Sequence, residues 1–487
     1  MNELVKCAAE AIGYKGEQCW NVEKYPDGQY SKAFLFTMDD GAQVVGKVPN
    51  PNAGPAHYVT ASEVATIDFM RTRLQTPVPK VLAWSSRADA TPVQAEYIIM
   101  EKAPGVQLST VWPRMERDQR KELLKSIAEY QKVWMSLSLN KYGSLYYSSD
   151  VAGSKGCTTT DENECETEDD RFTVGPATGR EFIEFGRMAL EFDRGPWKTP
   201  EEYRIAAGLR ELACVETAPQ LPLAPGTLYG PGPYRPSREK KIAALKVHLS
   251  LHPDLSAENI FVDPREPTKV VRFIDWQSTE IIPLFEHARP PYFINGDGSE
   301  MPLVDSDDFP DVEAINTMQP GAREVLVDMI SSQAPLIMYR SLNRRNNQRL
   351  FQAMEYRQTA GVEVTIFADN IFIDGEAWYL ARCLQLEHEW PHLPGVQAAG
   401  NPPFPLQFSE DEKVQIEQDF RDAMAGMQLM RDIKKSFGGM WTAKDVVMPE
   451  HYDAVQNQLD RVKTGLMLQI ARTDDERAIW AAQWPFW

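Results

Sequence analysis

The N-terminal residues contain four β-rich runs, with one amphipathic segment between the second and the third. This order limits them to a small sheet covered by a helix. Residues 34–38 and 43–48 are strand-like and are separated by Asp39-Asp40-Gly41, a typical hairpin turn. Apolar residues then recur at helical spacing over 60–74. Two more strand-like runs follow at 80–84 and 96–100. The order strand, strand, helix, strand, strand predicts a small, mostly antiparallel sheet within an α+β fold.

Pro104-Gly105 interrupts this pattern, because both residues disfavour regular structure. We therefore place a boundary near Lys102 and expect a β-rich lobe at 1–102. Residues 103–405 are predicted to form a larger, mostly helical lobe with loop-rich insertions, and 406–487 its C-terminal helical part.

Within the larger part, residues 120–137 read as a helix. Ser409 and Glu412 form a capping box ahead of an amphipathic segment whose row of methionines is more typical of a core than of a ligand groove. The acidic run 161–170 is predicted to be a solvated loop, and the proline-rich segment 219–236 a surface connection.

The charge balance excludes polyanionic partners. The sequence has 70 acidic and 51 basic residues among 487, a net charge of -19, which repels nucleic acid and anionic membrane surfaces. Solubility explains this acidity more simply than attraction of a cationic substrate does. The six cysteines form no C-x-x-C pair, and no run of about 18 apolar residues occurs. We expect a cytoplasmic protein, or a mitochondrial one if a transit segment precedes this sequence; the oligomeric state stays open.

The segment HPDLSAENIFVDPREPTKVVRFIDWQ, residues 252–277, gathers metal-binding side chains. Residues 260–262 and 270–274 are strand candidates around a proline-rich turn. If the register is symmetric about that turn, Asn259 and Asp275 lie opposite each other, and Asp254 lies in the loop just before. Two carboxylates and a carboxamide at one point suit a hard cation such as Mg²⁺ that holds phosphate.

These residues resemble a known family. Asp254 and Asn259 follow the catalytic-loop spacing D-x-x-x-x-N of kinases, and Asp275 stands where the second metal-binding aspartate belongs. The sequence reads HPD and IDW where protein kinases read HRD and DFG, and it has no A-P-E ending, which favours the aminoglycoside phosphotransferase and choline kinase-like family over protein kinases. A closer resemblance is to fungal members of that family, named phosphotransferase-family or altered inheritance of mitochondria proteins. The similar motifs are TASEVATIDFMRT, PVPKVLAWSS, AEYIIMEKAPGV, RGPWKTPEEY, NIFVDP and IDWQSTEIIPLFEHARPP.

The resemblance implies a bilobal protein-kinase-like fold with a small, mostly antiparallel five-stranded N-lobe, a larger helical C-lobe, and ATP bound between the lobes. The reaction it implies is magnesium-dependent transfer of the γ-phosphoryl group to a hydroxyl of a small molecule. Asp254 would orient the attacking hydroxyl, while Asn259 and Asp275 would hold Mg²⁺. Lys47 would contact the phosphates and Glu63 would be its partner on the helix.

Two further parts of the nucleotide site follow from the resemblance. The backbone from Glu101 to Ala103 would form the hinge that meets adenine. The loop 26–31 would cover the phosphates, and Gly28 is its one glycine, where relatives are usually richer. Fewer glycines leave the backbone amides less free to approach phosphate, which predicts weak nucleotide affinity.

Simpler interpretations stay open for these positions. Lys47 alone fits a solvated strand lysine, and Glu63 fits a capping box with Thr60. For the whole chain, the alternatives to a small-molecule kinase are a catalytically silent, kinase-like scaffold and, more weakly, a protein kinase.

The run His388-Glu389-Trp390-Pro391-His392 satisfies the zinc-protease pattern H-E-x-x-H. That pattern needs both histidines on one face of a continuous helix. Pro391 predicts that the helix ends before His392, so we expect no zinc site here.

Overall fold

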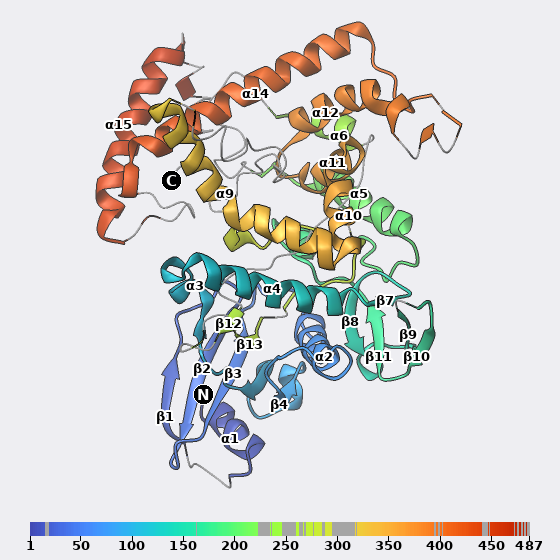
Figure 1. Ribbon diagram of the computed structural model, residues 1–487, viewed down its shortest axis with the longest axis vertical. Helices are drawn as coiled ribbons and strands as arrows, with labels where there is room; N and C mark the ends of the chain where they lie inside the picture. The colour runs from blue at the N-terminus through green and yellow to red at the C-terminus, as the bar shows by residue number, and fades with distance from the viewer. Residues whose placement is uncertain are drawn as a thin grey trace. The chain divides into compact units, whose positions relative to one another are not determined.

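The computed structural model forms two compact units (Figure 1). The first comprises Met1–Ala189, Asp193–Tyr203 and His252–Arg357, and the second Leu190–Phe192, Arg204–Leu251 and Gln358–Trp487. The predicted division near residues 102 and 405 stays a prediction. The structure describes residues 1–14, 19–161, 163–222, 234, 236–245, 260–262, 266, 269–275, 277–284, 288–294, 317, 319–393, 396–397, 400–401, 403–440, 447, 449–471, 473–474, 477–478, 481 and 484.

A five-stranded antiparallel sheet opens the first unit, as the sequence predicts. Its order is β1-β2-β3-β5-β4, with neighbouring strands paired antiparallel throughout. Both predicted hairpin strands and both later strands are therefore confirmed. The strands are β1 (Cys19–Lys24), β2 (Ser31–Met38), β3 (Gln43–Pro49), β4 (Val81–Ser85) and β5 (Tyr97–Glu101).

Two helices pack with this sheet. Helix α1 (Asn2–Ala11) buries Leu4 among the strand side chains, including Phe36. Helix α2 (Tyr58–Thr72) confirms the predicted helix, although it begins and ends two residues earlier than expected. The capping-box interpretation of Thr60 and Glu63 is wrong, because the helix starts before both and Glu63 is buried in its first turns.

A second, three-stranded sheet follows in the order β13-β12-β6. The central strand β12 (Ile260–Val262) pairs with β6 (Val106–Gln107) on one side and with β13 (Val270–Phe273) on the other, and the β12–β13 pair confirms the predicted hairpin. The predicted register is wrong by one residue: Ile260 pairs with Phe273, and the register shifts again between Phe261 and Val262. Asn259 and Asp254 lie outside the described residues.

Helices cover this second sheet. The predicted helix of residues 120–137 is α4 (Arg117–Trp134), which packs Tyr130 and Trp134 edge-on against Phe273 of β13, with ring centroids 5.3 and 5.2 Å away. Helix α3 (Leu108–Val111) contacts β12, while α9 (Pro320–Asn346) and α10 (Gln348–Arg357) pack against α4 and each other.

The acidic run 161–170 is not a loop throughout, as predicted, but contributes to a hairpin. Strands β9 (Cys157–Asp161) and β10 (Glu166–Asp169) pair antiparallel, and β7 (Leu137–Leu139) extends their sheet. On β10 the side chains of Glu166, Thr167 and Glu168 are exposed, while that of Asp169 is buried. A separate pair joins β8 (Ser144–Tyr147) to β11 (Phe172–Gly175).

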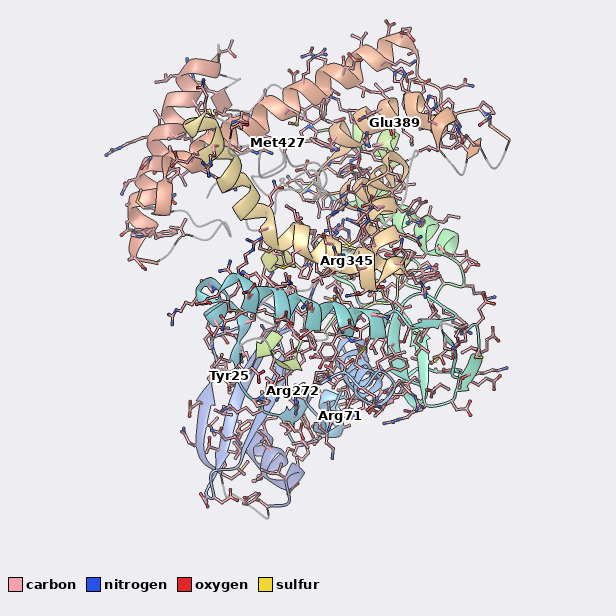
Figure 2. All side chains as sticks on the ribbon, viewed as in Figure 1. Tyr25, Arg71, Arg272, Arg345, Glu389 and Met427 are labelled. Atoms are coloured by element: carbon pink, nitrogen blue, oxygen red, sulfur yellow. The ribbon has the colours of Figure 1, made fainter. Side chains whose placement is uncertain are left out.

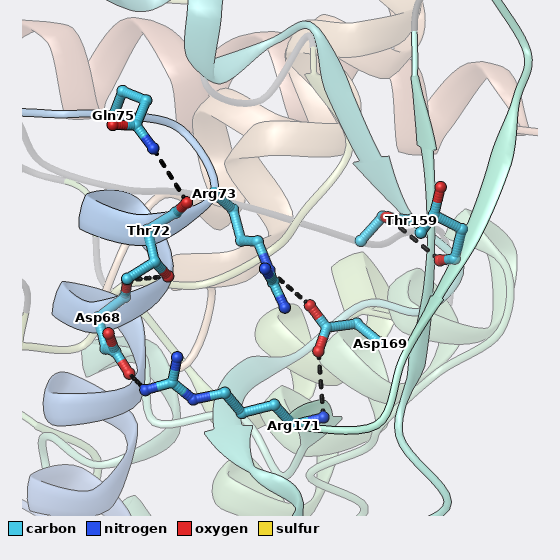
Figure 3. Close-up of polar contacts among 8 residues, drawn as sticks. Asp68, Thr72, Arg73, Gln75, Thr159, Asp169 and Arg171 are labelled. Atoms are coloured by element: carbon cyan, nitrogen blue, oxygen red, sulfur yellow. Dashed lines mark hydrogen bonds and ion pairs between the residues drawn. The ribbon is translucent and has the colours of Figure 1, made fainter.

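Figure 3 shows how this hairpin is tied to α2. Asp169 accepts a bond from Arg73 Nε at 2.7 Å, just beyond the end of α2, and from the Arg171 amide at 3.0 Å. Arg171 in turn pairs with Asp68 on α2. These contacts hold the last turns of the helix that carries Glu63.

Asp169→Ala is expected to lower the free energy of unfolding by about 1–3 kcal/mol, because it removes both bonds of a buried carboxylate. Urea unfolding followed by tryptophan fluorescence measures this loss. The matched control is Glu168→Ala, whose exposed side chain on the same strand should change stability by less than ~0.5 kcal/mol. Equal effects of the two variants would show that the hydrogen bonds of Asp169 do not contribute to the stability of the protein.

The second unit is mostly helical. Ser409 and Glu412 form the predicted capping box at the start of α14, and α12 ends at Glu389 with a 3₁₀ turn over Trp390–His392, so the predicted end of the helix before His392 is confirmed. Residues 223–233 and 235 of the predicted proline-rich connection lie outside the described residues. Among the helices that the structure describes, none has the length and apolar character needed to cross a membrane. The helices are α5 (Pro200–Thr217, which begins in the first unit), α6 (Arg238–Leu245), α11 (Ala360–Phe367), α12 (Glu376–Glu389), α14 (Glu410–Ser436) and α15 (Tyr452–Ile470).

A buried ionic cluster lies at the start of α12. Lys241 Nζ donates to Glu376 Oε2 at 2.9 Å and to the Ile371 carbonyl at 2.7 Å, and Tyr234 donates to the other Glu376 oxygen at 3.0 Å. Asp374 is 1% exposed beside them. Burial raises the pKa of Asp374 to about 8, against the opposing charge of Lys241.

This raised pKa predicts a pH-dependent stability. Folded Asp374 keeps its proton up to a pH of about 8, whereas the unfolded carboxyl releases it near 3.8, so stability falls as the pH rises between these values. Asp374→Asn stays neutral and is expected to stabilise the protein by about 1–3 kcal/mol at pH 7 and by almost nothing at pH 4. Urea unfolding at both pH values, with Asp460→Asn on the surface of α15 as control, measures the difference. The same gain at both pH values would contradict the prediction.

Candidate nucleotide and phosphate site

Three predicted site residues from distant parts of the sequence meet in the first unit. Lys47 Nζ on β3 lies 2.8 and 3.0 Å from the two carboxylate oxygens of Glu63 on α2, and 2.8 Å from Asp275 Oδ1. The Lys47 and Glu63 side chains are 12% and 4% exposed, whereas that of Asp275 is 49% exposed. The lysine therefore bridges a buried carboxylate and one that faces solvent.

Burial and ion pairing oppose each other at these three groups. Burial favours the neutral form of Lys47, but the attraction of Glu63 and Asp275 is stronger and raises the lysine pKa. Burial raises the pKa of Glu63, and the charge of Lys47 acts against that rise. At Asp275 the pull of Lys47 and Arg180 outweighs burial and lowers the pKa. Lys47 is charged and Asp275 is an anion at neutral pH.

The backbone turns sharply at Asp275. Strand β13 ends at Phe273, and Asp275 has a φ of 59°, a left-handed conformation that aspartate adopts more readily than most residues. This turn carries the carboxylate to Lys47 while leaving half of it exposed. An exposed anionic oxygen is the kind of ligand that Mg²⁺ prefers, so this residue fits the metal role. Asn259 and Asp254 lie outside the described residues, and their roles stay predictions.

Glu101 and Ala103 lie where the chain passes from the first sheet to the second. Strand β5 ends at Glu101 and β6 begins at Val106. The Glu101 amide donates to the Lys80 carbonyl at 3.0 Å, and Glu101 Oε2 accepts from the Lys80 amide at 3.0 Å. Arg71 and Arg272, labelled in Figure 2, each approach the same carboxylate to 3.9 Å. This position between two sheets suits a hinge, and contact with adenine stays a prediction.

Gly28 lies in the turn between β1 and β2. Its amide donates to the Ser31 carbonyl at 3.1 Å, and a Cβ at this position would come within 2.9 Å of the same oxygen. Asn50 Nδ2 donates to the Gly28 and Gln29 carbonyls, both at 3.3 Å. The glycine is therefore required by a tight turn in which its amide is already engaged.

Arg180 is a nearby cation that the sequence reasoning missed. It lies in the 3₁₀ helix Arg180–Phe182, and its guanidinium carbon stands 3.4 Å from the ring centroid of Tyr30 in the 26–31 loop. Its charge opposes the rise in the pKa of Glu63 and, after Lys47, helps to lower the pKa of Asp275. No kinase motif marks this position, and the arginine is distant in sequence from every other site residue.

Residues 21–286 match a known family, described as the phosphotransferase enzyme family. A subtelomeric hrmA-associated cluster protein of Aspergillus fumigatus is 31% identical over 61% of this chain and 64% of its own length. The chain thus spans somewhat less than two thirds of that relative. The altered inheritance of mitochondria protein 9 of Yarrowia lipolytica is 21% identical over 81% of this chain and 71% of its own length.

Solved structures with similarity include phosphotransferases. The gentamicin complex of APH(2")-IIa covers 76% of this chain and 98% of its own at 12% identity, with a TM-score of 0.31. A macrolide 2'-phosphotransferase type I covers 85% and 94% at 11% identity, with a TM-score of 0.32. The family assignment stands instead on residues 21–286, which are more than half of the 487 residues. This chain belongs to the phosphotransferase enzyme family and has its kinase-like, bilobal α+β fold.

Proposed function

We propose that this protein is an ATP- and magnesium-dependent phosphotransferase that moves the γ-phosphoryl group to a hydroxyl of a small molecule. The observation that carries the proposal is the contact of Lys47 with both Glu63 and Asp275. The lysine, held by the glutamate of the helix, supplies a fixed cation for phosphate, and the exposed aspartate beside it supplies an anion for a metal ion. Phosphoryl transfer depends mainly on such positioning and charge neutralisation.

Each residue has a distinct task in this proposal. Glu63 fixes the ammonium of Lys47, which orients the α- and β-phosphates. Asp275 and Asn259 would hold Mg²⁺, whose bound charge neutralises the phosphate oxygens. Asp254 would accept or orient the proton of the attacking hydroxyl.

A thermal-shift experiment tests the nucleotide site. ATP at ~100 times its Kd adds ~2.7 kcal/mol to the free energy of unfolding, so ATP with Mg²⁺ should raise the Tm clearly more than ATP with EDTA. Asp275→Asn should remove the Mg-dependent increment and leave the apo protein almost unchanged, because the aspartate is half exposed. If neither melting nor calorimetry detects ATP binding to the wild type, the catalytically silent scaffold becomes the better interpretation.

The acceptor is best sought among small molecules with a free hydroxyl. The net charge of -19 is compatible with a cationic acceptor. Labelled ATP incubated with a metabolite extract and the protein should yield a labelled product, and peptide mixtures serve as the test for protein-kinase activity. Label that appears only in peptides would overturn the small-molecule assignment.

Localisation is also a proposal. The Yarrowia lipolytica relative is named as mitochondrial, which supports the mitochondrial alternative to the cytoplasm. Imaging of the tagged full-length gene product separates the two compartments.

A further inference from the structure

We propose that Arg180 is a second phosphate-binding cation of this site, acting beside Lys47 where a glycine-richer loop would offer backbone amides. This inference rests on the proposed nucleotide site. It assigns a role to a residue outside the resemblance to kinase motifs, from the segment between β11 and α5.

The loop 26–31 has little backbone freedom. The Gly28 amide is engaged by the Ser31 carbonyl at 3.1 Å, and Asn50 holds the carbonyls of Gly28 and Gln29. The Asn50 amide also donates to the Tyr30 carbonyl at 2.8 Å. A loop tied in this way is poorly suited to wrap its amides around phosphate, so other donors must do so.

Arg180 has N–H donors available for a ligand. One of its terminal nitrogens donates to the Ala53 carbonyl at 3.1 Å, and its guanidinium stacks on Tyr30. Within the described part of the chain it forms no ion pair at 4.0 Å or less. Burial and a hydrogen bond to Glu184 raise the pKa of Tyr30 to about 12, so the ring beneath the guanidinium is neutral. Stacked arginines commonly bind phosphate with two parallel N–H groups.

Arg180 is also held in place before any ligand arrives. The preceding amide, that of Gly179, donates to the buried Glu280 Oε1 at 2.8 Å. A Cβ on Gly179 would come within 2.5 Å of the same carboxylate, so only glycine permits this approach. Glu280 follows Asp275 on the same connection, which ties the arginine to the segment that carries the metal-binding aspartate. Such fixing lowers the entropy lost when phosphate binds.

Calorimetric titration of the whole protein tests the inference with ATP, adenosine and inorganic tripolyphosphate. Arg180→Ala is expected to weaken ATP and tripolyphosphate about 10- to 100-fold, the range for lost hydrogen bonds to a charged group, and to leave adenosine unchanged. Arg180→Lys keeps the charge but not the paired donors and should recover part of the affinity. Arg114→Ala, which removes an exposed arginine of the same unit, is the matched control and should bind all three ligands as the wild type does.

A purely structural arginine would behave differently. It would hold the 26–31 loop through Tyr30, so its loss would weaken adenosine as much as ATP, and Tyr30→Phe, which removes the hydroxyl bond to Glu184, would have a comparable effect. Either that result or wild-type ATP affinity in a folded Arg180→Ala protein overturns the inference. If Arg180→Ala fails to fold, as its apo melting curve shows, Arg180→Lys decides on the same criteria.

The outcomes also separate this inference from the proposed function. If the wild type binds ATP but transfers phosphate to no acceptor, the proposed function fails while the ATP affinities still decide the role of Arg180. If the wild type binds no ATP, the affinities of the wild type and the variants for tripolyphosphate decide the role of Arg180. The absence of tripolyphosphate binding overturns the inference.

Discussion

Asp254→Asn is expected to lower kcat at least ~10²-fold while leaving folding and ATP affinity nearly unchanged. A positioned carboxylate that accepts or orients a proton contributes on this scale, and asparagine keeps its shape without its charge. The prediction rests on the D-x-x-x-x-N spacing between Asp254 and Asn259, since both residues lie outside the described part of the structure. ATP consumption with the acceptor found in the extract screen, measured at saturating ATP, gives kcat directly.

The matched control for this variant is Asp39→Asn, in the exposed turn between β2 and β3. It makes the same chemical change far from the phosphates and should retain wild-type kcat. A homogeneous Asp254→Asn preparation that turns over at the wild-type rate would remove Asp254 from the site. A matching loss of ATP affinity would instead assign it to binding.

The N-terminal sheet could be predicted because its information is local. Residues 34–48 contain two alternating runs and the Asp39-Asp40-Gly41 turn, and the hydrogen bonds they predict form between neighbouring strands. The acidic hairpin at 157–169 was missed because charge suggested solvent exposure. An exposed strand can still pair in a sheet, and the threonines of the paired strand β9 supply β-propensity.

Residues of the site could be predicted from the sequence only where they belong to a motif of known spacing. Lys47, Glu63 and Asp275 were identified by resemblance, and the structure brings them together as an ion-paired set. The register of the β12–β13 hairpin came out wrong by one residue, because an irregularity between Phe261 and Val262 breaks the assumed symmetry. Arg180 reaches the site through tertiary packing against Tyr30, and no local pattern encodes that contact.

Lys47→Met should destabilise the apo protein and also weaken ATP stabilisation with or without Mg²⁺. The variant keeps a long side chain but leaves the buried carboxylate of Glu63 without its cation. Breaking a buried pair by removing one partner costs about 3–5 kcal/mol, whereas the half-exposed Asp275 adds little. Urea unfolding of the apo protein measures the first effect, and the Tm increment with ATP and EDTA measures the second.

A second substitution separates the two effects. Glu63→Gln on the Lys47→Met background removes the unpaired charge and should recover most of the apo stability, because no buried anion is left to desolvate. It should not recover the ATP increment, since phosphate meets the ammonium of Lys47 directly. Lys32→Met, on the exposed side of β2, is the control and should alter neither quantity. Recovery of ATP stabilisation in the double variant would mean that Lys47 acts only by supporting Glu63, and the phosphate-binding role would pass to another cation.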